Sequence, residues 1–305
     1  MHDDTVARQF GFVGGLVPGV DVYAYMTHPA VTRWRGTFLE RGVLEARFVK
    51  PVYDGEPTTI TARDANGGLD IEVRCRDELC ATGHARLGSL PAPSLTAFAA
   101  VPAVAHRPAA DQATLARNRW LGIRPLTVTA QFAAQYYDDV RETDPIYAAE
   151  GLCHPGLLPR LCNWALVHNV VLGPWIHVGS RIEHFAAVQI GDQLSVRAKI
   201  VANDERKGHR FVELDGLVVA DEQRPIARIA HTAIWQPRHA RPKAGRLLLA
   251  VGLGRPHARG LGGRQDAAGD FVAGTPRQPQ HQHRGHRRHQ ADDDEGGGKV
   301  RHRRG

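Results

Sequence analysis

The stretch RFVKPVYDGE at residues 47–56 has a counterpart later in the chain, EHFAAVQIGD at residues 183–192. A Pro-Gly pair precedes each stretch, at 18–19 and at 155–156, and a segment with helical periodicity lies between the pair and the stretch. Each block also ends in a strand-like segment with a late histidine, ATGHARL in the first block and RIAHTAIW in the second. These matched signals indicate that one α+β unit occurs twice.

The spacing of glycines supports this duplication. Gly19 and Gly55 are 36 residues apart, and Gly156 and Gly191 are 35 residues apart. A steady offset across helix and strand signals is typical of an internal repeat, whereas two unrelated α+β blocks would match only by chance.

Three helices are predicted from the apolar periodicity. Residues 20–41 and 157–172 each place apolar side chains on one helical face, and Pro29 should kink the first segment or begin a second helix there. Another helix should follow Thr129, which is a suitable N-cap residue. We interpret four apolar side chains of the two longer helices as core rather than as pocket lining: Val22, Met26, Leu161 and Trp164.

Strands are predicted around these helices. Residues 43–64 and 69–87 alternate and are rich in β-branched residues, and Asn66-Gly67-Gly68 between them is a tight-turn signal. Strand-like segments then run through residues 181–235. A helix followed by a run of antiparallel strands predicts a sheet wrapped around one apolar helix in each block.

The chain divides into four predicted segments. These are a first unit at 1–87, a linker rich in proline and alanine at 88–118, a second unit at 119–237 and a basic tail at 238–305. The tail holds 15 Lys or Arg and 6 Asp or Glu, a net charge of +9, whereas the whole chain carries +7. The residues before the tail therefore carry −2, so the basic charge of the chain belongs to the tail and is no evidence that the folded part binds nucleic acid.

The tail is rich in Arg, Gly, His and Gln and cannot bury a core. Three interpretations compete for it. The tail could be disordered, it could be a basic arm that binds nucleic acid or metal, or it could be an out-of-frame translation of a GC-rich gene. The abrupt change of composition directly after the last strand favours the third.

The chain has four cysteines, Cys75, Cys80, Cys153 and Cys162, which form no CxxC pair and have no histidine pair at zinc-finger spacing. We predict reduced, mostly buried thiols, with no metal and no cofactor. No apolar run approaches the ~18 residues of a membrane span. The first residues also lack the basic and apolar regions of a signal peptide, so we expect a cytoplasmic protein.

Three motifs resemble those of MaoC-type hotdog-fold acyl dehydratases and hydratases. They are ARQFGFVGGLVPG at 7–19, ARFVKPVYDGE at 46–56, and ETDPIY with the following HPG at 142–156. The similarity covers roughly residues 2–236 in two copies. It implies an α+β double hotdog, in which two antiparallel sheets, each wrapped around a central helix, lie side by side with both helices on the same face.

The same resemblance implies the ligands and partners. Members of this family bind acyl-CoA or acyl-carrier-protein thioesters in a tunnel between the two units. Active members hydrate a trans-2-enoyl thioester or dehydrate the (R)-3-hydroxy form. We also expect a homodimer or a heterodimer of hotdog subunits that uses no cofactor and binds neither nucleic acid nor membrane.

The loop at 142–147 has exchanged residues relative to the family pattern, which is close to Gly-Asp-x-Asn-Pro-Ile-His-x-Asp. Arg141 falls at the glycine, Glu142 at the catalytic aspartate, Asp144 at the asparagine and Tyr147 at the catalytic histidine. Glu142 could still act as a carboxylate, but a phenol that titrates near pH ~10 is a poor substitute for an imidazole. The loop also resembles the variant loop of FAS1-like dehydratase N-terminal units, in which this half supports substrate binding.

The chain begins inside the corresponding loop of the first unit. His2 falls at the catalytic histidine and Asp4 at the later aspartate of the pattern, so both are candidate catalytic residues beside Glu142 and Asp144. The position of the catalytic aspartate has no residue here. One interpretation is a truncated reading of a longer gene, and the other is a genuine start in which His2 is a frayed terminal residue.

The resemblance implies four substrate-binding residues: Tyr147, His154, Gly156 and Gly19. The two glycines begin the central helices, whose N-terminal amides can polarise a thioester carbonyl. His154 could supply a different base, although a histidine before Pro-Gly is more commonly a local hydrogen-bonding group.

Three functions are compatible with these residues. The leading one is an acyl-thioester-binding relative of (R)-specific enoyl-CoA hydratases and 3-hydroxyacyl dehydratases. The second is a non-catalytic acyl-binding subunit that completes a hotdog heterodimer. The third is an acyl-CoA thioesterase, in which Glu142 or Asp144 would activate water.

Overall fold

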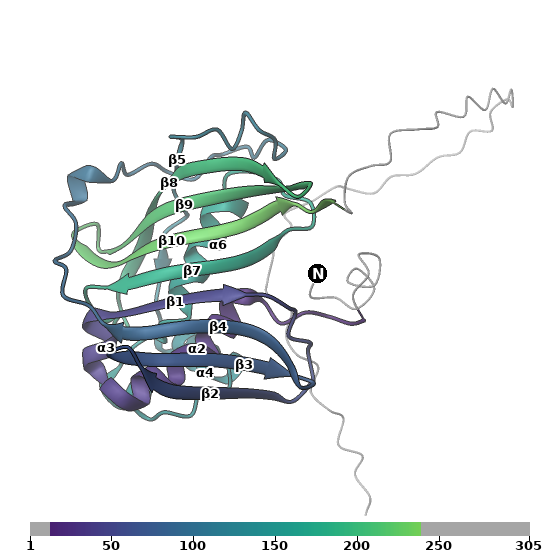
Figure 1. Ribbon diagram of the computed structural model, residues 1–305. Coiled ribbons are helices and arrows are strands. Elements are labelled where there is room, and N and C mark those ends of the chain that lie inside the picture. Colours follow the sequence, from purple (N-terminus) through teal and green to yellow (C-terminus); the bar gives the residue numbers. More distant parts are fainter. Residues whose placement is uncertain (1–12, 239–305) are drawn as a thin grey trace, which may run out of the picture. The chain divides into compact units, whose positions relative to one another are not determined.

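The computed structural model describes residues 13–238, and their strands form one antiparallel ten-stranded sheet in the order β2-β3-β4-β1-β7-β10-β9-β8-β5, with β6 also paired to β8 (Figure 1). The strands are β1 (Gly42–Phe48), β2 (Thr58–Ala65), β3 (Gly68–Cys75), β4 (Glu78–Leu87), β5 (Trp120–Leu121), β6 (Leu126–Thr127), β7 (Ile176–His184), β8 (Gln193–Arg206), β9 (His209–Ala220) and β10 (Arg224–Gln236). The helices are α2 (Gly19–Trp34), α3 (Gly36–Arg41), α4 (Ala130–Asp139), α5 (Ile146–Glu150), α6 (Leu157–Val167) and the 3₁₀ helix η1 (Leu95–Ala97).

The sheet consists of two halves that join edge to edge. β1 of the first half pairs antiparallel with β7 of the second half, from Val43 opposite Glu183 to Arg47 opposite Gly179. Helix α2 contacts the strands of the first half and β7, whereas α6 contacts β7, β8, β9 and β10. Both helices lie behind the sheet in Figure 1, and a salt bridge of 2.6 Å from Arg160 to Asp21 links them. This is the expected α+β arrangement, in which two antiparallel sheets, each wrapped around a central helix, lie side by side.

The predicted duplication is visible in the backbone hydrogen bonds. Before each central helix, the chain pairs with the segment that follows the first long strand of the same half. Residue numbers in the second copy of each bond exceed those in the first by 136. The matched bonds are Val17 N to Val52 O with Cys153 N to Val188 O, and Asp54 N to Gly15 O with Ile190 N to Gly151 O. Gly55 and Gly191, which also differ by 136, both have positive φ angles, of 75° and 105°.

The first helical segment breaks at a different residue from the one predicted. Pro29 lies inside α2 without ending it, and the break falls at Arg35, whose φ is 52° and whose amide donates to Val31 O. No second helix begins at Pro29, so that alternative was wrong, because α2 accommodates the proline in its interior and the next helix, α3, begins only at Gly36. The second long helix is shorter than predicted and ends at Val167. The N-cap at Thr129 is confirmed, since its Oγ1 accepts from Phe132 N at 3.1 Å.

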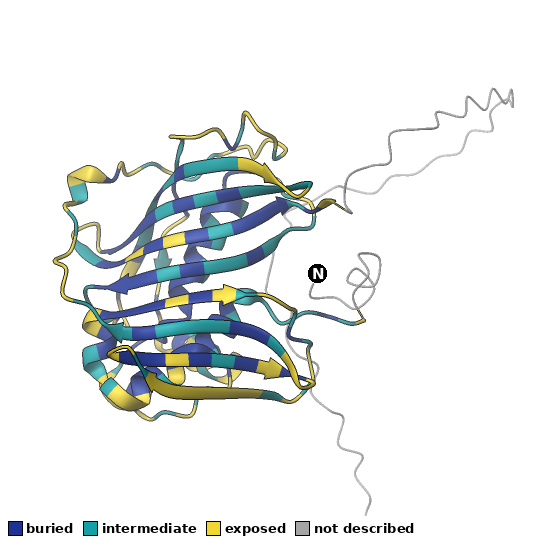
Figure 2. Ribbon diagram, viewed as in Figure 1, coloured by how far each residue is buried: buried dark blue, intermediate teal, exposed yellow. Residues whose placement is uncertain are grey.

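The core lies between the helices and the inner face of the sheet. Of the four helical residues interpreted as core, Val22, Met26 and Leu161 are fully buried and Trp164 packs against the same cluster with part of its surface exposed. Burying a side chain of this size contributes roughly 2 kcal/mol to folding. Strands alternate between buried and exposed residues, while the edge strand β2 is exposed along most of its length (Figure 2).

The remaining segments carry little regular structure. Between β4 and β5 the only helix is η1, and Phe98 and Leu115 of this stretch are buried. All four cysteines are free and buried, as predicted. None of the helices in the described part of the chain is long and apolar enough to span a bilayer. The predicted basic tail lies outside the described residues, apart from Arg238.

Candidate functional site

The ETDPIY loop connects α4 to α5 and is fixed at both of its acidic residues. Asp144 Oδ1 accepts from the amide of Ile146 at 3.0 Å, so it caps the start of α5. Its Oδ2 accepts from Arg35 Nη1 at 2.7 Å, and its side chain is 6% exposed. Because Arg35 belongs to the first half, this ion pair ties the loop to the break between α2 and α3.

The carboxylate of Glu142 has hydrogen-bond donors on both oxygens. Oε1 accepts from the amides of Thr143 and Asp144, at 2.7 Å each, and from His28 Nδ1 of α2 at 2.8 Å. Oε2 accepts from His154 Nε2 at 3.1 Å. The side chain is 2% exposed. A carboxylate offers about four lone-pair positions, so this one has little capacity left to orient a reacting water.

The pKa of Glu142 follows from the same contacts. Burial alone would raise it, but the hydrogen bonds from His154, from the Asp144 amide and from His28 outweigh burial and lower the pKa from 4.5 to about 2. A general base works best when its pKa lies near the working pH. Glu142 is therefore a hydrogen-bond acceptor that organises the loop, and it is a weak base at neutral pH.

His154 is held in one tautomer. Its Nδ1 accepts from the amide of Gly156 at 3.0 Å, so its Nε2 carries the proton that is donated to Glu142. Burial lowers the pKa of His154, against the opposing effect of Glu142. Both ring nitrogens are occupied and the side chain is fully buried. The structure thus gives His154 the role of a local hydrogen-bonding group and leaves it no free nitrogen for a substrate.

Tyr147, at the position of the family histidine, is buried with its ring 4.8 Å from that of His154. Burial, followed by the charges of Glu142 and Asp144, raises the pKa of its phenol far above the usual value. Its hydroxyl has no partner among the described residues, and neither has that of Tyr136. A phenol that stays protonated can donate a hydrogen bond, but it cannot replace a histidine as a base.

The amides that begin α6 are closed by local bonds. Gly156 N donates to His154 Nδ1, Leu157 N donates to His154 O at 3.1 Å, and Leu158 N donates to Pro155 O at 3.0 Å. A Cβ on Gly156 would lie 2.5 Å from that of Ala24. Gly156 therefore serves close packing between α6 and α2, and this helix end presents no free donor to a ligand.

The amides that begin α2 are different. Asp21 N and Val22 N both donate to Pro18 O, at 2.9 and 3.0 Å. The amides of Gly19 and Val20 have no acceptor among the described residues. A Cβ on Gly19 would lie 3.0 Å from Nδ1 of His177, a β7 residue of the other half. Two backbone donors at a helix N-terminus, beside an imidazole, can bind a carbonyl oxygen or an anion.

The structure brings together five of the residues predicted from the sequence: Glu142, Asp144, Tyr147, His154 and Gly156. Gly19 lies at the other helix end, and His2 and Asp4 lie outside the described residues. Sequence reasoning missed His28 and Arg35, because their partners are more than a hundred positions away. The late histidine of RIAHTAIW was noticed only as a sign of the repeat.

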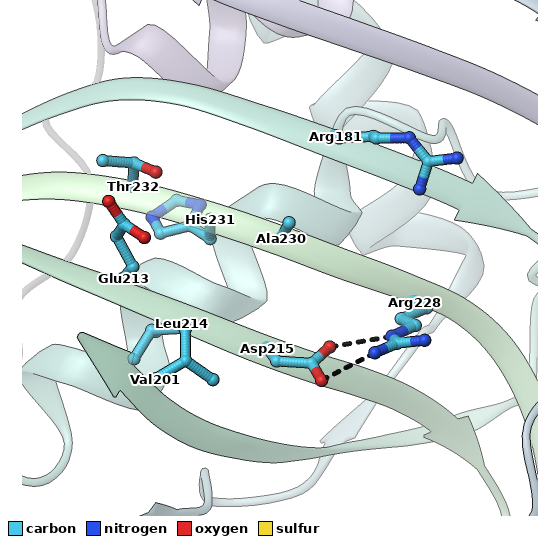
Figure 3. Close-up of a pocket in the computed structure, with 9 residues that line it drawn as sticks. All are labelled: Arg181, Val201, Glu213, Leu214, Asp215, Arg228, Ala230, His231 and Thr232. Atoms are coloured by element: carbon cyan, nitrogen blue, oxygen red, sulfur yellow. Dashed lines mark hydrogen bonds and ion pairs between the residues drawn. The ribbon is translucent and has the colours of Figure 1, made fainter. Parts of the chain in front are cut away.

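A separate groove of about 400 Å³ crosses the outer face of β7, β8, β9 and β10, with the helices behind the strands (Figure 3). It contains none of the candidate site residues predicted from the sequence, although His231, the late histidine of RIAHTAIW, contributes to its lining. Arg228 and Asp215 in it form two hydrogen bonds of 2.9 Å with each other. Among the described residues, no cluster of three or more His, Cys, Asp or Glu side chains is arranged to hold a metal ion.

The continuous sheet with two central helices on one face defines a double-hotdog protein. A conserved protein from Mycobacterium tuberculosis, described as having a double hotdog fold, superposes with a TM-score of 0.53 at 16% identity, over 76% of this chain and 86% of that one. A Chloroflexus aurantiacus protein assigned as a MaoC domain dehydratase gives 0.50 at 12% identity, over 77% and 86%.

At these identities the likeness shows the fold, and it confirms at that level the resemblance to MaoC-type hotdog proteins seen in the sequence. No family model and no curated protein matches the chain.

Proposed function

We propose that this protein binds acyl thioesters and is a relative of MaoC-like enoyl-thioester hydratases and 3-hydroxyacyl dehydratases, with its second unit as the supporting half. The observation that carries the proposal is the contrast between the two helix ends. Glu142 and the first α6 amides are occupied within the protein, whereas the amides of Gly19 and Val20 at α2 have no acceptor among residues 13–238. A thioester carbonyl is an acceptor that suits such donors.

The hydration reaction sets requirements for the chain. A carbonyl must be polarised while water adds at the β-carbon and a proton reaches the α-carbon. The α2 amides meet the first requirement. Because Glu142 is a weak base and Tyr147 stays protonated, we assign the acid–base work to the first-unit candidates His2 and Asp4 rather than to the ETDPIY loop.

A second candidate function is a non-catalytic acyl-binding subunit of a hotdog heterodimer. The occupied carboxylate of Glu142 and the phenol at position 147 favour it, because both remove acid–base groups from the second unit. In either case the ligand is an acyl-CoA or acyl-carrier-protein thioester, the assembly is a homodimer or a hotdog heterodimer, and the protein acts in the cytoplasm.

Two measurements on the purified full chain test these functions. Calorimetric titration with butyryl-CoA, which cannot be hydrated, should show binding, and the absence of binding contradicts the proposal. Incubation with crotonyl-CoA should then lower the enoyl absorbance if the protein is a hydratase. Binding without turnover favours the subunit function. Release of free CoA from butyryl-CoA would instead support a thioesterase and would require Glu142 or Asp144 to leave its present partners.

A further inference from the structure

A buried chain of three polar side chains joins β7 and β10, and its last member, His231, also contributes to the lining of the groove in Figure 3. His177 Nε2 is 2.8 Å from Ser180 Oγ, and that same oxygen is 2.9 Å from His231 Nδ1. The two imidazole rings stack with centroids 4.2 Å apart. The residues are 6%, 4% and 1% exposed, respectively. We call these three residues the β7–β10 triad.

A β-bulge brings the triad together. Ser180 pairs with His231 across the two strands, so their side chains share a face. In a regular strand, residues three positions apart point to opposite faces. The register between β7 and β10 shifts at Thr232/Ala233, where Gly179 and then His177 are the paired residues. The extra residue of this bulge returns His177 to the face of Ser180.

Hydrogen counting shows that the triad is incomplete. The Ser180 hydroxyl has one proton, so it can donate to only one imidazole and must accept from the other. In either arrangement, one outer nitrogen carries a proton and the other carries a lone pair. These outer atoms are His177 Nδ1 and His231 Nε2, and neither makes a hydrogen bond of normal geometry to a described residue, although the Gly179 backbone lies close enough to the His177 ring to affect its pKa. Buried polar atoms are nearly always paired in native proteins, so these two atoms point to a missing partner.

The outer nitrogen of His177 faces the open end of α2. Nδ1 is the atom nearest to the place where a Cβ of Gly19 would stand, at 3.0 Å. The amides of Gly19 and Val20, which have no acceptor in the described part of the chain, belong to the same helix turn. The ring of Phe48 packs edge-on against the imidazole with centroids 4.8 Å apart, so the surroundings are apolar on that side. Two amide donors and a switchable imidazole therefore lie together.

The ligand that fits this set offers two different groups. The amides require an acceptor, such as the carbonyl oxygen of a thioester. His177 Nδ1 is a donor in one tautomer and an acceptor in the other, which suits a hydroxyl, because a hydroxyl can both accept and donate. A 3-hydroxyacyl thioester carries a carbonyl at C1 and a hydroxyl at C3 of the same short chain.

We propose that the α2 N-terminus and the β7–β10 triad form a site for 3-hydroxyacyl thioesters, in which His177 Nδ1 binds the 3-hydroxyl. Ser180 and His231 are positioning residues that set the tautomer and the ring orientation of His177. This site deepens the proposed function and rests on it, because it presumes that the protein binds acyl thioesters.

The test compares two ligands that differ by one hydroxyl, (R)-3-hydroxybutyryl-CoA and butyryl-CoA, by calorimetric titration of the full chain. The wild-type protein should bind the hydroxylated thioester about tenfold more tightly, as expected for one hydrogen bond. His177→Phe should abolish this preference, so that the two ligands bind with Kd values within about twofold of each other. His184→Phe is the matched control, because His184 is also buried on β7 with an unpaired Nε2 but lies beside Phe38. It should keep the preference.

A second variant and a direct observation guard against misfolding of His177→Phe. Ser180→Ala leaves both rings in place and should reduce the preference to about threefold. Nitrogen-15 NMR of labelled histidine should show the His177 Nδ1 resonance moving with the hydroxylated ligand and not with butyryl-CoA. Equal affinity of the wild type for both ligands, or an unmoved resonance, overturns the site while the proposed function stands. Failure to bind either ligand overturns both.

Discussion

The two central helices begin with similar residues, but they differ in whether their first backbone amides are hydrogen-bonded within the protein. Val17-Pro18-Gly19 opens α2, and His154-Pro155-Gly156 opens α6. At α6 the imidazole of His154 folds back onto the Gly156 amide, and its other nitrogen holds Glu142. At α2 the valine has no group that can accept from Gly19. A helix N-terminus is thus a ligand site only when the preceding residue leaves its amides free.

The difference also divides the work between the duplicated units. At the α6 end the amides and the imidazole of His154 are bonded locally, while Glu142 binds His28 and Asp144 binds Arg35 of the first unit. At the α2 end the amides of Gly19 and Val20 have no acceptor within residues 13–238, and His177 of the β7–β10 triad lies beside Gly19. Residues of each half therefore take part in contacts at the helix start of the other.

Lowering the pH should have the largest effect on stability, because a buried, neutral imidazole lies beside the N-terminus of each central helix. Burial lowers the pKa of His154, and it lowers that of His177 from 6.5 to about 3. The unfolded chain takes up these protons near pH 6.5, so the stabilising contribution is complete above that pH and is lost as the pH falls toward 3. His177 alone should cost about 3 kcal/mol at pH 4.5.

Urea unfolding at pH 7.5 and pH 4.5 measures this loss. His177→Phe should make stability less dependent on pH over the same range, because one titrating group is removed. An unchanged dependence in that variant would show that His177 is not neutral and buried.

Adding a methyl group at each helix start sharpens the comparison. Gly156→Ala should destabilise the protein by about 3 kcal/mol, because the new Cβ would meet Ala24 and the Tyr136 hydroxyl at 2.5 and 2.7 Å. Gly19→Ala should cost only about 1 kcal/mol, since the nearest atom, on His177, is 3.0 Å away. Urea midpoints of the two variants provide the check, and equal losses would contradict the difference in packing.

Glu142→Gln probes the closed end. The amide would present a donor where the protein needs an acceptor, opposite the fixed N–H of His154, and should cost about 2 kcal/mol. The Kd for butyryl-CoA should stay within about twofold, because Glu142 organises the loop and does not face the ligand.

The pH window of Glu142 gives an independent check. Because the folded pKa is lowered from 4.5 to about 2, its contribution is present above pH 4.5 and lost as the pH falls toward 2. Wild type and Glu142→Gln should therefore differ in pH dependence only below pH 4.5. A difference between pH 5 and 7 would mean that the carboxylate titrates there and could serve as a base.

Val17→His places at the start of α2 the residue type that caps the first amide of α6, and it should have the smallest effect on folding. If its imidazole caps Gly19 as His154 caps Gly156, the affinity for butyryl-CoA should fall about tenfold, or about 1.4 kcal/mol, as an amide donor is lost. Unchanged affinity with intact stability would argue that the α2 amides do not hold the thioester. Val17→Leu is the matched control and should bind normally.

Local signals in the sequence were enough for the fold. The duplication, the N-cap at Thr129 and the turn at Asn66-Gly67, where both φ angles are positive at 49° and 74°, all depend on neighbouring residues. The sequence could not show that Arg35, rather than Pro29, ends the helix, because the residue adopts its strained backbone where its side chain reaches Asp144, 109 positions away.

The sequence identified several residues of the candidate site, but it did not reveal their hydrogen-bond partners. The loop motif identified Glu142 and His154, but one of the hydrogen bonds that saturate the Glu142 carboxylate comes from His28 of the other unit. The β7–β10 triad depends on a bulge, and nothing in the alternation of β7 predicts where that extra residue falls.

The most direct test of the central claim is an NMR titration of backbone amides with butyryl-CoA. The account predicts that the resonances of Gly19 and Val20 move with ligand concentration, while those of Gly156 and Leu157 stay in place. Movement at Gly156 and Leu157 with Gly19 and Val20 unaffected would contradict it, and would place the thioester at the end that the structure shows closed.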